Sequence, residues 1–165
     1  MSNIAIFLDR DGVINEEKKD YVKNINEFKI FDYVSAAINL LKENNFLVIL
    51  ITNQSAINRG FTTHENVIMI HDKIQEILKP FQTKIDAFYY CPHTPEESCS
   101  CRKPKTKLIL KAVTTWKIDL KSSWFFGDSD SDIIAGKSLD CKTIKIGSNF
   151  NLEDAVQKVE ESLGK

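Results

Sequence analysis

The sequence predicts an α/β protein built as a three-layer sandwich around a mostly parallel sheet. Short apolar runs such as FLVILI (46–51) alternate along the chain with helical patterns of apolar residues. Strands that are apolar throughout are covered on both faces, which favours parallel strands joined by right-handed crossovers. The 165 residues are 42% hydrophobic and 27% charged, which indicates one globular domain over 1–165 and excludes disordered and fibrous proteins.

Five segments are predicted to be buried strands, because each is a short apolar run bounded by turn residues. In chain order they are IAIFLD (4–9), FLVILI (46–51), IDAFYY (85–90), SWFFG (123–127) and KTIKI (142–146). Parallel sheets bind ligands at the carboxyl ends of their strands. Those ends carry Asp9, Thr52, Cys91 and Asp128, so we expect the functional site at this edge.

The predicted helices begin and end at recognisable signals. Asp32 is expected to cap the first, and Thr62 with Glu65 forms the pattern of a capping box for the second, which Pro80 closes. Further helices are expected from Leu108, after Asp128 and from Asn151. Apolar periodicity places Leu163 on the inward face of the last one, and the two histidines of the second helix, His64 and His71, are expected to face solvent.

Charge and hydropathy limit the function classes. No apolar run approaches the roughly 18–20 residues of a membrane helix, and the first residues lack a secretory signal pattern. We therefore expect a cytoplasmic protein without a membrane partner. The formal net charge of −1 argues against a nucleic-acid partner. No oligomerisation segment is evident, so a monomer is expected.

Two pairs of aspartates follow predicted strands. Asp9 and Asp11 follow the first strand, and Asp128 and Asp132 follow the fourth. Carboxylates that converge on one edge repel each other unless a cation is present, and a hard divalent ion such as Mg²⁺ prefers oxygen ligands. The alternative is that each pair only caps the end of a strand or helix.

Three of the four cysteines lie within eleven residues, in the pattern Cys91-x-His93-x5-Cys99-x-Cys101. Three thiolates and one imidazole form a closed tetrahedral set for a structural Zn²⁺. Free thiols or a loop disulfide are the alternatives. Zinc would order a loop over 91–105 that has few apolar side chains, and would thereby fix Arg102 and Lys103. Cys141 stands alone and is expected to be a buried apolar residue.

The order of the polar segments resembles the haloacid dehalogenase superfamily of phosphohydrolases. The segments that carry the resemblance are DRDG (9–12), Thr52, Lys103 and GDSDSD (127–132). The resemblance implies a Rossmann-like core in which Asp9 is the nucleophile and Asp11 the general acid and base. It further implies that Mg²⁺ binds Asp9, Asp11 through its backbone carbonyl, and Asp128. Thr52 and Lys103 would stabilise the transferring phosphoryl group, and Asp132 would orient Lys103.

The cysteine loop is similar to that of one branch, the heptose-bisphosphate and histidinol-phosphate phosphatases. CPH and CSCRKP within 91–104, DRDGVIN (9–15), Asp20-Tyr21-Val22 and TNQSAINRG (52–60) carry this similarity. It implies a set of residues that bind the sugar phosphate: Thr52, Asn53, Gln54, Ser55, Arg59, Arg102 and Lys103. The chain has only three arginines, and the third, Arg10, is left without a role in binding and can be structural.

The 52–60 loop resembles that of enzymes acting on the 7-phosphate of D-glycero-D-manno-heptose 1,7-bisphosphate. The short spacer between His93 and Cys99 instead resembles histidinol-phosphate phosphatases, and Ser129 stands where the heptose branch commonly has lysine. A histidinol-phosphate phosphatase is therefore the first alternative. A nucleic-acid end-processing phosphatase and an inactive, zinc-stabilised binding module are further alternatives.

The length also bears on specificity. Many members of the superfamily insert a cap domain over the active site, and the predicted core already uses residues 4 to 146. We therefore expect no cap domain. Specificity would come from three loops, 12–26, 52–60 and 91–105.

Overall fold

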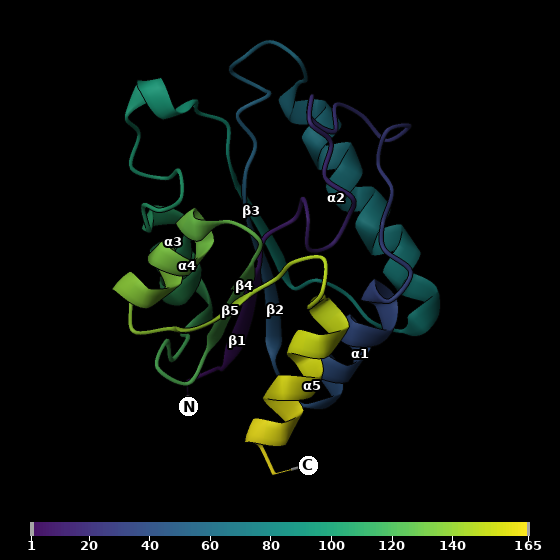
Figure 1. The fold of residues 1–165 in the computed structure, drawn as a ribbon, viewed down its shortest axis with the longest axis vertical. Helices are drawn as coiled ribbons and strands as arrows, with labels where there is room; N and C mark the ends of the chain where they lie inside the picture. The colour runs from purple at the N-terminus through teal and green to yellow at the C-terminus, as the bar shows by residue number, and fades with distance from the viewer. Residues whose placement is uncertain (1, 165) are drawn as a thin grey trace.

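The computed structural model describes residues 2–164, so the two ends of the expected 1–165 domain lie outside the described residues. Its centre is a five-stranded sheet in which all neighbouring strands are parallel, in the order β3-β2-β1-β4-β5 (Figure 1). The strands are β1 (Ala5–Leu8), β2 (Leu47–Asn53), β3 (Ala87–Cys91), β4 (Trp124–Gly127) and β5 (Lys142–Lys145).

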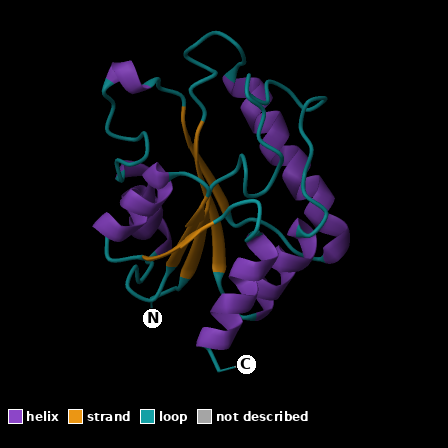
Figure 2. Ribbon diagram, viewed as in Figure 1, coloured by secondary structure: helices purple, strands orange, loops and turns teal. Residues whose placement is uncertain are grey.

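Helices cover both faces of the sheet, which confirms the predicted three-layer α/β sandwich (Figure 2). On one face lie α1 (Val34–Glu43), α2 (His64–Leu78) and α5 (Leu152–Ser162). On the other lie α3 (Lys107–Trp116) and α4 (Asp130–Ser138). Two short 3-10 helices, η1 (Lys79–Phe81) and η2 (Pro95–Glu97), complete the elements. Within residues 2–164 no inserted domain covers the carboxyl ends of the strands.

Side chains of the central strand alternate between two apolar clusters, as a strand's period of two requires. Ile6 and Leu8 pack with α1, α2 and α5, whereas Ala5 and Phe7 pack with α3 and α4. All four are fully buried. Cys141 is 5% exposed and belongs to the second cluster, which confirms its expected apolar role.

The strand order reverses between β1 and β4. From β1 the chain builds outward to β2 and β3 on one side, and then returns to β4 and β5 on the other. Such a switch point opens a crevice at the carboxyl ends of the two central strands. Asp9 follows β1 and Asp128 follows β4, so the topology brings the two predicted acidic pairs together.

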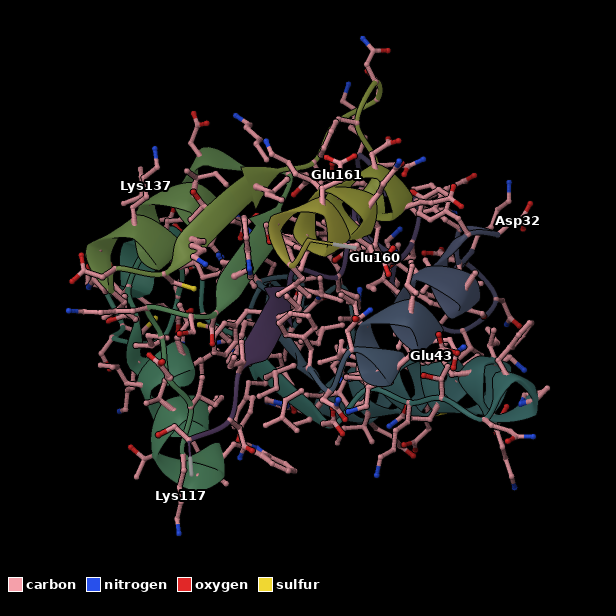
Figure 3. The ribbon with its side chains drawn as sticks, turned by 90° about the horizontal axis from the view of Figure 1, so that it is seen from below. Asp32, Glu43, Lys117, Lys137, Glu160 and Glu161 are labelled. Atoms are coloured by element: carbon pink, nitrogen blue, oxygen red, sulfur yellow. The ribbon has the colours of Figure 1, made fainter. Side chains whose placement is uncertain are left out.

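Two predicted helix caps are wrong by one residue. Asp32 does not cap α1: it is exposed (Figure 3), and the N-cap is Tyr33, whose side chain makes no capping bond. At α2 the cap is Thr63, which accepts a bond from Asn66 N. Thr62 instead donates to the carbonyl of Lys23, and so ties the loop before α2 to the loop after β1.

Three further expectations are corrected. His71 is 5% exposed, because it lies on the buried face of α2 and stacks on Phe88 with ring centroids 4.6 Å apart. Leu163 is 50% exposed and is the C-cap of α5, whose last helical residue is Ser162. Thr52 does not follow β2 but lies within it, since the strand extends to Asn53.

The outer face of α1 and α5 is polar. Glu43 of α1 and Glu160 and Glu161 of α5 lie on the side of the molecule seen from below in Figure 3. None of the helices in the described part of the chain is long and apolar enough to cross a membrane.

Candidate active site

Loops from the carboxyl ends of β1, β2, β3 and β4 surround a cavity of about 440 Å³. They converge at the upper end of the sheet in Figure 1. The cavity is lined by Asp9, Asp11, Glu17, Lys18, Tyr21, Val22, Asn53, Gln54, Ser55, Arg59, Arg102, Lys103, Asp128, Ser129, Ser131 and Asp132. Most of the predicted catalytic and binding residues are thus brought together. Thr52 is the exception: it is buried behind the cavity, where its hydroxyl accepts a bond from Gln54 at 2.9 Å.

Three carboxylates form an acidic cluster in this cavity. Asp9, Asp128 and Asp132 each offer an oxygen within 4.8 Å of the others. Burial, only partly offset by Lys103, raises the pKa of Asp9 to about 6. Burial and the nearby Asp9 raise that of Asp128 to about 7. Oxygen donors that resist ionisation at such short range fit a hard divalent cation, which would relieve their repulsion.

Lys103 supplies the positive charge at the base of the cavity. It is 3% exposed, and its ammonium donates to the carbonyl of Ile51 at 2.7 Å and lies 2.6 Å from Asp132 Oδ1 and 3.0 Å from Asp9 Oδ1. Burial alone would lower the pKa of Lys103, but the two carboxylates outweigh it and raise the pKa, so the amine is charged. Asn53 fixes the backbone of Lys103 with a reciprocal pair of bonds, at 3.0 and 3.2 Å.

Asp132 is held by the start of α4. Its Oδ2 accepts bonds from the backbone and hydroxyl of Ser129 at 3.1 and 2.9 Å, which leaves Oδ1 for Lys103. Gly127 makes room for it, since a Cβ there would lie 2.2 Å from the Asp132 side chain. Ser129 therefore caps α4 and orients Asp132. A lysine at position 129 would supply a positive charge instead of this cap.

Asp11 lines the same cavity but is not one of the three clustered carboxylates. Its oxygens accept bonds from Gln54 at 2.9 Å, from Asn15 at 2.9 Å and from Arg10 at 3.0 Å. Burial acts to raise the pKa of Asp11, but the Arg10 charge and these bonds outweigh it and lower the pKa. The two aspartates of the first loop thus sit in opposite electrostatic environments.

The cysteine loop brings four metal-ligating atoms together. Cys91 Sγ lies 3.0 Å from Cys101 Sγ and 3.6 Å from Cys99 Sγ, and His93 Nδ1 lies 3.2 Å from Cys101 Sγ. Corners of a tetrahedron around a zinc ion with bonds of about 2.3 Å lie roughly 3.8 Å apart, so these atoms are near enough to share one ion, with some pairs closer than the ideal spacing. The donor set therefore fits Zn²⁺, and none of the four cysteines forms the disulfide that was an alternative.

Contacts around this cluster connect it to the cavity. The backbone N–H of Arg102 donates to Cys99 Sγ at 3.3 Å, and the Arg102 guanidinium donates to the carbonyl of His93 at 3.3 Å. Burial acts to raise the pKa of Cys99, but backbone N–H donors from Arg102 and Cys101 outweigh it and lower the pKa to about 7. Arg102 is thus hydrogen-bonded to two residues of the cluster, Cys99 and His93.

Six cavity residues are not among those predicted to form the site: Glu17, Lys18, Tyr21, Val22, Ser129 and Ser131. The first four lie in the irregular loop after β1, where no periodicity signals which side chains point inward. Tyr21 has a positive φ of 69° and stacks on Phe61 with ring centroids 5.8 Å apart. The only sequence signal for it was the Asp20-Tyr21-Val22 segment, which marks the loop without a role for the ring.

Known proteins resemble this chain over most of its length. A Helicobacter pylori (strain J99) protein named D-glycero-beta-D-manno-heptose-1,7-bisphosphate 7-phosphatase is 40% identical over 82% of this chain and 78% of its own length. A Campylobacter jejuni protein named as the corresponding alpha-anomer phosphatase is 40% identical over 87% of this chain and 82% of its own.

Among solved structures, the D,D-heptose 1,7-bisphosphate phosphatase of B. bronchiseptica, complexed with magnesium and phosphate, superposes with a TM-score of 0.86 at 27% identity. That match covers 98% of this chain and 99% of the other. The family model described as "Polynucleotide kinase 3 phosphatase" matches residues 3–156. The chain therefore belongs to the polynucleotide kinase 3 phosphatase family, whose domain is a phosphatase of the haloacid dehalogenase type.

Proposed function

We propose that the protein is a Mg²⁺-dependent phosphatase that removes the 7-phosphate of D-glycero-D-manno-heptose 1,7-bisphosphate. The observation that carries this proposal is the lining of the cavity, where Asp9 and Asp128 lie beside the buried ammonium of Lys103 and where two arginines, Arg59 and Arg102, also contribute. A guanidinium binds phosphate through two parallel N–H donors. These arginines are therefore suited to bind the second phosphate of a bisphosphate. The heptose phosphatase names of the relatives support the same substrate.

In this proposal Asp9 attacks the phosphorus, and the bond between phosphorus and the sugar oxygen breaks to leave an aspartyl phosphate. Asp11 would give a proton to the departing sugar oxygen, which requires that it be protonated in the substrate complex although Arg10, Asn15 and Gln54 lower its pKa in the empty site. Asp11 then takes a proton from water as the water attacks the phosphorus, which releases phosphate and restores Asp9 and the protonated Asp11.

Other groups stabilise the charge on the phosphoryl group. Asp9, Asp128 and the backbone carbonyl of Asp11 would hold Mg²⁺, which supplies a positive charge beside the transferring oxygens when it is bound. Lys103 supplies a second positive charge, and Asp132 keeps that ammonium aimed at Asp9. In the same proposal Cys91, His93, Cys99 and Cys101 bind a structural Zn²⁺.

The alternative substrates fit the cavity less well. Histidinol phosphate carries an ammonium in place of a second phosphate, and would meet Arg59 and Arg102 with the wrong charge. A polynucleotide end is the substrate in the name of the matched family. Binding it requires positively charged contacts to phosphates along a strand, whereas the formal net charge of this chain is −1. An inactive binding module would have no use for the Asp9–Lys103 contact at 3.0 Å.

We also propose that the chain acts as one domain and as a cytoplasmic monomer. None of the four cysteines forms a disulfide, which suits a reducing compartment. The loops 12–26, 52–60 and 91–105 provide side chains to the cavity and would supply the specificity of a separate cap.

The test is a parallel measurement of phosphate release from four substrates with Mg²⁺ present. They are the alpha and beta anomers of the heptose bisphosphate, histidinol phosphate and a 3′-phosphorylated oligonucleotide. We expect kcat/KM to be highest for one of the two heptose anomers. A preference for histidinol phosphate or for the oligonucleotide would overturn the proposed substrate. Both anomers are tested because the Helicobacter pylori relative is named for the beta anomer and the Campylobacter jejuni relative for the alpha anomer.

A further inference from the structure

Arg10 lies between two catalytic residues but does not reach the cavity. Asp9 and Asp11, on either side of it in the sequence, both line the cavity, whereas Arg10 does not. Its side chain is 0% exposed, although arginine is large and charged and is rarely fully buried. Arg10 therefore cannot contact the substrate, and its guanidinium approaches Asp11 from inside the protein.

Within residues 2–164, the side-chain hydrogen bonds of Arg10 are all made with Asp11. Nη2 lies 3.0 Å from Asp11 Oδ1 and 3.2 Å from Asp11 Oδ2, and Nε lies 3.3 Å from Oδ1. Nη1 has no hydrogen-bond partner among residues 2–164. Two guanidinium nitrogens on two carboxylate oxygens fix the plane of the carboxylate as well as its position.

Two neighbours complete this arrangement. Asn15 donates to Asp11 Oδ1 and Gln54 donates to Asp11 Oδ2, each at 2.9 Å. His71 does not compete for Asp11 as a second cation, because burial and the Arg10 charge lower its pKa to about 3 and keep it neutral. Every donor on Asp11 thus acts on one orientation of its carboxylate.

Stability alone does not account for this ion pair. Burying a guanidinium costs solvation energy, and replacing a buried ion pair with apolar residues is often neutral or stabilising. The contact of two guanidinium nitrogens with one carboxylate instead suits a residue whose orientation matters. We propose that Arg10 is a positioning residue that orients the Asp11 carboxylate for proton transfer, an inference that rests on the role of Asp11 in the proposed function.

The test begins with matched Arg-to-Lys substitutions. Arg10→Lys keeps the charge but loses the two-nitrogen contact. We expect kcat on the heptose bisphosphate to fall about 10- to 100-fold, as misplacement of a reacting group does, while KM stays within about twofold. Arg59→Lys is the contrast, since Arg59 lines the cavity. It should raise KM with a smaller effect on kcat.

A double-mutant cycle with Asp11→Asn shows whether Arg10 acts through Asp11. We expect Arg10→Lys to cause no further loss of kcat in the Asp11→Asn background, because the group that Arg10 orients is already lost. Losses that multiply, or a rise in KM with kcat unchanged, would overturn the inference. Wild-type activity that does not need Asp11 would instead refute the proposed function, so the two failures are distinguishable.

A folding defect is separated by a second variant and a second measurement. Arg10→Gln retains a buried polar side chain, and each variant is checked by thermal unfolding and by Mg²⁺ titration. We expect both variants to fold and to bind Mg²⁺ as the wild type does. If neither folds, Arg10 has a structural role and the inference is wrong.

Discussion

Gly12 lies against Asp128, a carboxylate proposed to bind Mg²⁺, and Gly12→Ala tests whether this close approach places that carboxylate. Gly12 has a φ of +82°, and a Cβ at this position would lie 2.1 Å from Asp128 Oδ2. Ordinary contact requires about 3.4 Å, so the carboxylate oxygen has to move by about 1.3 Å. The positive φ adds about 1–2 kcal/mol of backbone strain for any residue with a Cβ.

Gly60→Ala is the matched control. Gly60 has a φ of +80° with nothing within 4 Å of an added Cβ, so alanine there carries the backbone strain without the clash. We expect both variants to lose about 1–2 kcal/mol in urea unfolding without metal. Only Gly12→Ala should bind Mg²⁺ more weakly, and its kcat/KM should fall about 100-fold because Asp128 is displaced.

The assays are isothermal titration with Mg²⁺, urea unfolding and phosphate release from the heptose bisphosphate. A Gly12→Ala protein with wild-type Mg²⁺ affinity and activity would refute the inference that this close approach places Asp128. Equal loss of Mg²⁺ affinity in Gly60→Ala would show that backbone strain, rather than the clash, is responsible.

Two further predictions concern the two metal sites. The pKa values of Asp9 and Asp128 are raised to about 6 and 7, above the 3.8 of an unfolded aspartate. The folded, metal-free protein therefore holds these protons more tightly than the unfolded chain, and its stability falls as pH rises from the unfolded to the folded pKa values. Mg²⁺ competes with those protons, so calorimetric Mg²⁺ affinity should increase between about pH 5 and pH 8, and a flat profile would contradict the assignment. Cys101→Ser should lower the zinc content of the purified protein well below one ion per chain and reduce kcat/KM roughly tenfold or more, by releasing the loop that carries Lys103. Cys141→Ser, outside the cluster, should retain its zinc, and full activity in zinc-free Cys101→Ser would separate zinc from catalysis.

The acidic cluster could be predicted because parallel topology converts sequence order into proximity. Asp9 and Asp128 follow the two central strands, and the carboxyl ends of these strands share one edge of the sheet. The zinc-loop residues could be grouped for a different reason: the ligand-forming residues are so near in sequence that few loop conformations keep them apart.

Other features depend on packing that periodicity does not specify. Thr62 and Thr63 are adjacent hydroxyl residues, and which one caps α2 depends on the contact of Thr62 with Lys23 in a distant loop. His71 follows Val67 by four residues and precedes Ile74 by three, so helical periodicity does place it on the buried face. The prediction that His71 faces solvent is therefore wrong for a reason that this periodicity reveals.

The Arg10–Asp11 contact could not be predicted from spacing. Consecutive residues of a strand point to opposite faces, so an ion pair between neighbours is not expected there. β1 ends at Leu8, and the turn that follows lets the guanidinium fold back on the next residue. The positions of Lys18 and Tyr21 in the cavity could not be predicted either, because irregular backbone has no periodicity that indicates where a side chain points.

The most direct test of the central claim is the site of covalent phosphorylation during one turnover. Excess enzyme is mixed with the heptose bisphosphate and Mg²⁺, quenched in acid within milliseconds and analysed by mass spectrometry of its peptides. We expect a transient phosphate on Asp9, absent in Asp9→Asn, with loss of the 7-phosphate and retention of the 1-phosphate. Phosphate release by Asp9→Asn at the wild-type rate, or a phosphorylated residue other than Asp9, would contradict the account.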